Sequence, residues 1–69
     1  MSTVKELRAQ KARLVVEARA EYEKINDKMS PEERKAQETK ADGIILRAEA
    51  LEADAVRLER VSALETGLE

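Results

Sequence analysis

Carboxylates at close spacing are the first side chains in this sequence that could do chemistry. Three pairs lie within about one helical turn of each other: Glu17 with Glu21, Glu32 with Glu33, and Glu49 with Glu52. A carboxyl group acts as a general acid or base only when burial in a pocket shifts its pKa. The chain has no histidine and no cysteine, so the usual general base and the thiol nucleophile are both missing. We therefore expect solvated helix faces, no enzyme, and no cofactor or metal.

The composition favours long helices. Charged residues make up 41% of the 69 residues, and Tyr22 is the single aromatic residue. A chain rich in Ala, Glu, Leu, Lys and Arg is typical of long or coiled helices. A core of this size rarely supplies more than about 3–5 kcal/mol of net stability. We therefore expect the chain to gain stability from self-association or from a larger assembly.

The formal net charge of −2 predicts no strong attraction to nucleic acid. Residues 1–30 carry seven basic against five acidic residues (+2), and residues 31–69 carry six against ten (−4). We interpret these as two helix faces whose opposite charges favour antiparallel pairing. No apolar run approaches the roughly 18 residues of a membrane span, and no signal-peptide core follows Met1. The expected chain is soluble and cytoplasmic, and binds neither nucleic acid nor a membrane.

A capping motif at residues 30–33 divides the chain into two helices. Ser30 is a favourable N-cap, Pro31 fits the first helical position, and Glu33 can complete a capping box with Ser30. Because proline disfavours the α conformation at the residue before it, a preceding helix must stop by about Met29. The sequence therefore predicts a helix at about 4–27, a loop at 28–30 and a helix at about 31–66.

Both expected helices carry an apolar stripe at helical spacing. In the second helix, Ile44, Leu51 and Leu58 recur every seven residues, next to alanines with the same repeat. Large residues beside alanines predict a close contact between helices. The expected fold is all-α: one antiparallel two-helix hairpin or coiled coil over residues 1–69, with a longer second helix. The predicted hairpin core is Leu7, Leu14, Ala18, Tyr22, Ile44 and Ala48.

The expected turn also predicts which residues face each other. If the chain turns at residues 28–30, Leu7 faces Leu51. Tyr22 then faces Ala36, and the second helix has no partner beyond about Ala55. An exposed apolar stripe usually marks an interaction site. The predicted oligomer or partner interface is Leu51, Val56, Leu58, Val61, Leu64 and Leu68.

A set of short motifs covers nearly the whole chain: Leu7-Arg8, Arg13-Leu14, Glu17-Ala18-Arg19, Ser30-Pro31-Glu32-Glu33, Ile44 and Leu51. In this order the motifs resemble the N-terminal delta domain of major capsid proteins from tailed phages with the Hong Kong 97-type fold. The resemblance implies an internal scaffold that drives capsomer and procapsid assembly by helical self-association and is then removed by a maturation protease. It also implies a following capsid shell domain, and a location in the cytoplasm of the host bacterium and in the procapsid interior.

Two other interpretations remain open. One is a coiled-coil docking or adaptor module that binds a partner protein; the genes beside this one would distinguish it from a capsid protein. The other is a nucleic-acid-binding helical arm, which predicts salt-dependent binding. The residues that would contact phosphates in such an arm are Lys5, Arg8, Lys11 and Arg13.

Overall fold

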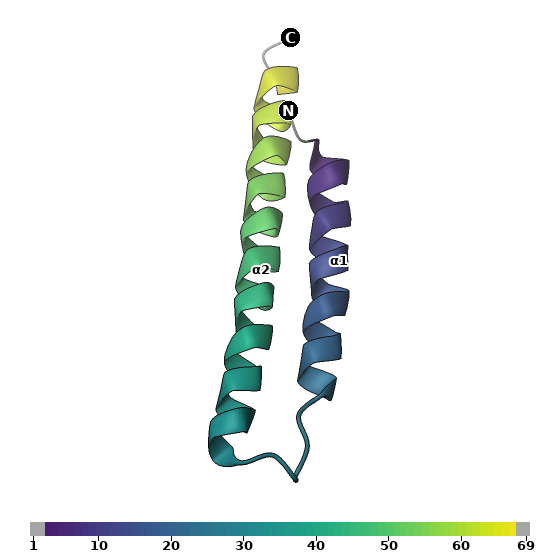
Figure 1. The fold of residues 1–69 in the computed structure, drawn as a ribbon. Coiled ribbons are helices and arrows are strands. Elements are labelled where there is room, and N and C mark those ends of the chain that lie inside the picture. Colours follow the sequence, from purple (N-terminus) through teal and green to yellow (C-terminus); the bar gives the residue numbers. More distant parts are fainter. Residues whose placement is uncertain (1–2, 68–69) are drawn as a thin grey trace.

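The computed structural model describes residues 3–67, which form two long antiparallel helices lying side by side (Figure 1). Helix α1 spans Val4–Glu23 and helix α2 spans Pro31–Gly67. The hairpin is a rod with extents of 61 × 17 × 15 Å. The two helices pack against each other along α1, and the described residues contain no strand. This confirms the predicted all-α hairpin with a longer second helix.

Both helices begin at the caps that the sequence predicts. The Ser30 hydroxyl accepts from the Glu33 amide at 3.1 Å, and the Glu33 carboxylate accepts from the Ser30 amide at 3.1 Å. The bond from the Ser30 amide lowers the pKa of Glu33, because it favours the ionised carboxylate, and the nearby Ser30 hydroxyl adds to this effect. At the start of α1, the Thr3 hydroxyl accepts from the Glu6 amide at 3.1 Å. Each cap satisfies backbone donors that the first helical turn leaves free.

Helix α1 ends at Glu23, about four residues earlier than the sequence predicts. The reason is Asn26, whose side-chain oxygen accepts from the Lys28 amide at 2.8 Å while its side-chain amide donates to the Lys24 carbonyl at 3.3 Å. Asparagine side chains compete with the helix for backbone groups in this way. The connection therefore covers residues 24–30, where the sequence predicts a loop of 28–30.

The seam between the helices is built mainly from alanine. Ala18, Ala41 and Ala55 are completely buried, and Ala48 is 3% exposed. Leu7 is the one large side chain among the buried residues of the described chain. Alanines let two helices approach closely, so the seam has little room for larger side chains.

The predicted core is therefore only partly correct. Leu7, Ala18 and Ala48 are buried, whereas Leu14 and Ile44 are half-buried. The placement of Tyr22 in the core is wrong, because its side chain is 38% exposed. Its hydroxyl instead donates to the Asp42 carboxylate at the surface.

The facing register also differs from the predicted one. Tyr22 reaches Asp42 of α2, six residues beyond the predicted neighbour Ala36. At the other end of α1, Arg8 contacts both Glu52 and Glu59. The seven-residue connection replaces the three-residue loop on which the predicted register depended, so α1 pairs with a later part of α2. The unpaired end of α2 is correspondingly shorter than predicted.

Candidate interaction surface

The C-terminal end of α2 extends past the start of α1 (Figure 1). The last residue of α2 with a contact to α1 among the described polar pairs is Glu59. Residues 60–67 continue the helix for about 12 Å at 1.5 Å per residue. We call residues 60–67 the overhang. All of its residues are exposed.

The predicted interface residues occupy three different environments. In the overhang, Val61 is 49% exposed and Leu64 is 66% exposed. Leu58 and Leu51 are half-buried beside α1. The remaining members are Val56, which is 41% exposed, and Leu68, which lies outside the described residues. The structure therefore exposes an apolar stripe at the end of α2.

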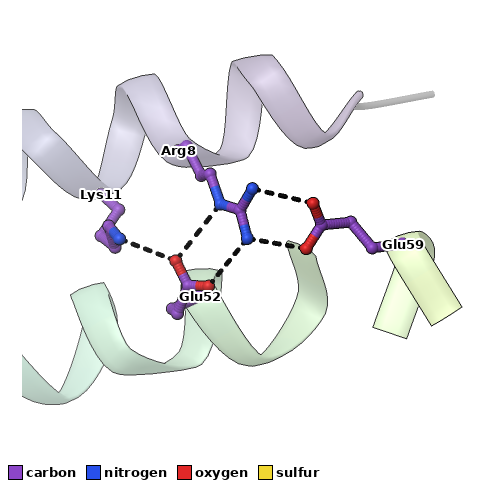
Figure 2. A network of polar contacts seen from close by, with 4 residues as sticks. All are labelled: Arg8, Lys11, Glu52 and Glu59. Atoms are coloured by element: carbon purple, nitrogen blue, oxygen red, sulfur yellow. Dashed lines mark hydrogen bonds and ion pairs between the residues drawn. The ribbon is translucent and has the colours of Figure 1, made fainter. Parts of the chain in front are cut away.

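One side of the hairpin is held together by an ion-pair network (Figure 2). The Arg8 guanidinium donates to both oxygens of Glu59, at 2.9 and 2.8 Å, and also to both oxygens of Glu52. The Lys11 ammonium lies 2.7 Å from Glu52. Bidentate arginine–carboxylate contacts impose geometry more strongly than single ion pairs do. Glu52, placed between two cations, therefore fixes how the start of α1 sits on α2.

The network shifts the pKa values of Glu52 and Arg8. The hydrogen bonds from Arg8 and Lys11 lower the pKa of Glu52 from 4.5 to about 2. The two carboxylates raise the pKa of Arg8 above its ordinary value. General acid catalysis at neutral pH needs a raised carboxyl pKa, the opposite of what Glu52 has. Glu52 is therefore suited to structural ion pairing.

The opposite side of the seam has no such network and forms an open groove instead. The groove has a volume of about 680 Å³. Its floor is apolar, and its rims are charged. We call it the seam groove. Its lining residues are Gln10, Arg13, Leu14, Glu17, Arg47, Ala50, Leu51 and Asp54.

A polar cluster lies between the seam groove and the loop. The Glu21 carboxylate accepts from Lys24 at 2.9 Å, from the Gln37 side-chain amide at 2.9 Å, and pairs with Lys40 at 3.2 Å. These contacts lower the pKa of Glu21 from 4.5 to about 2. The same Gln37 amide also donates to the Glu21 main-chain carbonyl at 2.7 Å. Glu21 thereby joins the last turn of α1 to α2.

Sequence reasoning missed the seam groove, although a signal for it exists. Gln10, Arg13, Leu14 and Glu17 are spaced by three, one and three residues. The α2 residues of the groove, which begin at Arg47, have the same spacing. This spacing places each set on one face of its own helix, and the structure brings the two faces together on one side of the seam. Because most members are charged or polar, an apolar-stripe search passes over them.

The nucleic-acid interpretation finds little support in the geometry. Arg8 and Lys11, two of the four cations of the nucleic-acid interpretation, are engaged by carboxylates of α2. Among residues 3–67, no acidic cluster is suited to holding a metal ion. Neither described helix has an apolar stretch long enough to cross a membrane.

Comparisons of the chain with protein-family models, with curated proteins and with solved structures found no significant match.

Proposed function

We propose that this chain is a helical self-association module that serves as the internal scaffold of a phage-type major capsid protein. The observation that carries the proposal is the overhang. In the overhang, where α2 extends beyond α1, Val61 is 49% exposed and Leu64 is 66% exposed. Covering such a stripe by association removes apolar surface from water, which favours assembly.

The energetics of the hairpin suit a transient scaffold. Most of its buried residues are alanines, and its ion pairs lie at the surface. Alanine buries little area and exposed ion pairs contribute little, so the isolated hairpin is marginally stable. A hairpin of low stability unfolds readily and is then accessible to proteases, which fits removal by a maturation protease. The family motifs around Leu14 and Ser30 are the reason for placing this module in a capsid protein.

Sedimentation equilibrium over a wide concentration range tests the proposal. We expect the chain to self-associate, and Val61→Asp with Leu64→Asp to shift it to monomer. The matched control is Val16→Asp on α1, since Val16 is 69% exposed and lies away from the overhang. In the full capsid protein, the double variant should prevent procapsid formation, whereas the control should not. A wild-type chain that stays monomeric at the highest concentration reached would overturn the proposal.

The alternative is a docking or adaptor module whose overhang binds another protein. The same exposed residues, Val61 and Leu64, support it. It differs in predicting a monomeric chain by itself and a gene neighbourhood without portal and maturation-protease genes. A wild-type monomer that binds an encoded neighbour through these two residues would favour the alternative.

A further inference from the structure

The seam groove and the overhang belong to one continuous face of α2. Leu58 and Val61 of α2 lie seven residues after Leu51 and Asp54, which line the groove. Residues seven apart on a helix lie almost above one another. A body that covers the overhang on this face therefore also lies along the groove. We therefore expect one and the same partner to cover both the seam groove and the overhang.

The charges on the two rims of the groove are ordered. Two contacts fix which levels of the helices face each other: Lys11 of α1 contacts Glu52 of α2, and Tyr22 of α1 contacts Asp42 of α2. Glu17 lies midway between the two α1 residues, and Arg47 lies midway between the two α2 residues. Glu17 and Arg47 are therefore level along the rod, on opposite rims of the groove.

The other end of the groove carries the complementary arrangement. Arg8 contacts residues on both sides of Asp54, namely Glu52 and Glu59, so Asp54 lies near the level of Gln10. Arg13 follows Gln10 within one turn on the same rim. Each rim thus carries one cation and one anion, in opposite order along the rod. Among the described residues, Arg13, Glu17 and Arg47 make no ion pair, whereas Asp54 pairs with Arg57 of its own helix at 2.9 Å.

We infer that a second copy of this chain occupies the seam groove, related by a two-fold axis parallel to the helices. The inference rests on the proposed self-association and specifies its geometry. In this arrangement α1 of one copy lies over α2 of the other, as in a four-helix bundle. Glu17 then meets the partner's Arg47, and Arg13 and Gln10 lie towards the partner's Asp54. Leu14 and Leu51 of both copies form the centre.

The opposite orientation fits less well. A two-fold axis perpendicular to the helices would place α1 over α1 of the partner, in antiparallel orientation. It would also send the two overhangs to opposite ends of the bundle. The parallel axis brings both overhangs to one end, where Val61 and Leu64 of each copy can cover one another. The apolar surface of the overhangs therefore favours the parallel axis.

Charge reversal tests the arrangement with the full chain. We expect Glu17→Arg and Arg47→Glu to weaken self-association by about tenfold each, or about 1.4 kcal/mol. Each single variant creates two like-charge contacts between the copies. Mixing the two variants should restore association, because a mixed dimer has opposite charges at both contacts. Charge pairs within one chain would not be restored by mixing.

The control is Glu49→Arg, which makes the same change of net charge outside the groove and should associate like the wild type. Circular dichroism checks that every variant remains helical, and native mass spectrometry counts the mixed dimers. Two results would overturn the proposed dimer geometry but not the proposed function: single variants that associate as tightly as the wild type, or a mixture in which association is not restored. A wild-type chain that never associates would overturn both this inference and the proposed function.

Discussion

The side-chain amide of Gln37 on α2 donates to the main-chain carbonyl of Glu21 on α1 at 2.7 Å. The last four carbonyls of a helix lack the usual i+4 donor. The Glu21 carbonyl accepts from the Lys24 amide at 3.3 Å, and the neighbouring helix supplies a second donor. The Gln37 side-chain amide also reaches the Glu21 carboxylate at 2.9 Å. A single glutamine thus caps one helix while fixing its distance from the other.

We therefore expect Gln37→Ala to destabilise the hairpin by about 1 kcal/mol, the usual net value of a partly buried hydrogen bond. Urea unfolding followed by circular dichroism measures the change. Thr39→Ala, at an exposed position two residues further on, is the control and should have little effect. Equal stability of the two variants would mean that the cap contributes nothing measurable.

The alanine seam should be intolerant of larger side chains. Ala48 is 3% exposed, so Ala48→Leu must separate the helices and should cost about 1–3 kcal/mol. Ala53→Leu makes the same change on the exposed face of α2 and should be nearly neutral. Thermal unfolding of both variants provides the comparison, and a tolerated leucine at position 48 would contradict the close packing of the seam.

Gly43 lies inside α2 without a structural need for glycine. A Cβ added there meets no atom within 4 Å. Gly43→Ala should therefore stabilise the chain by up to about 1 kcal/mol, because alanine has the higher helix propensity. Gly67→Ala, at the last residue of α2, should give a smaller gain since helix ends fray. An unfolding midpoint lowered by Gly43→Ala would show that another contact uses this position.

Acid should weaken the hairpin through Glu21 and Glu52. Folding lowers both pKa values from 4.5 to about 2, so their stabilisation is complete above about pH 5 and is lost as the pH falls towards 2. The urea midpoint should fall over this range. A variant with Glu21→Gln and Glu52→Gln should be less stable than the wild type at pH 7, and the difference should vanish near about pH 2. A difference independent of pH would contradict the ion pairing.

The sequence by itself determined the elements and their order. The caps at Thr3 and Ser30, the proline at position 31 and the apolar repeats are local signals, and local hydrogen bonding enforces them. They were enough to predict an antiparallel hairpin with a longer second helix. They also identified Leu7, Ala18 and Ala48 as buried.

Only the tertiary structure decided the register, and with it the surfaces left for partners. The contacts of Asn26 that end α1 early are local, but the contact of Gln37 with Glu21 joins residues sixteen apart. The network of Arg8 with Glu52 and Glu59 joins residues still further apart. Such contacts depend on side-chain reach between helices, which helical spacing within one helix does not encode. The sequence alone predicted the overhang but not the seam groove, because most lining residues of the groove are charged or polar and lie outside the apolar stripes.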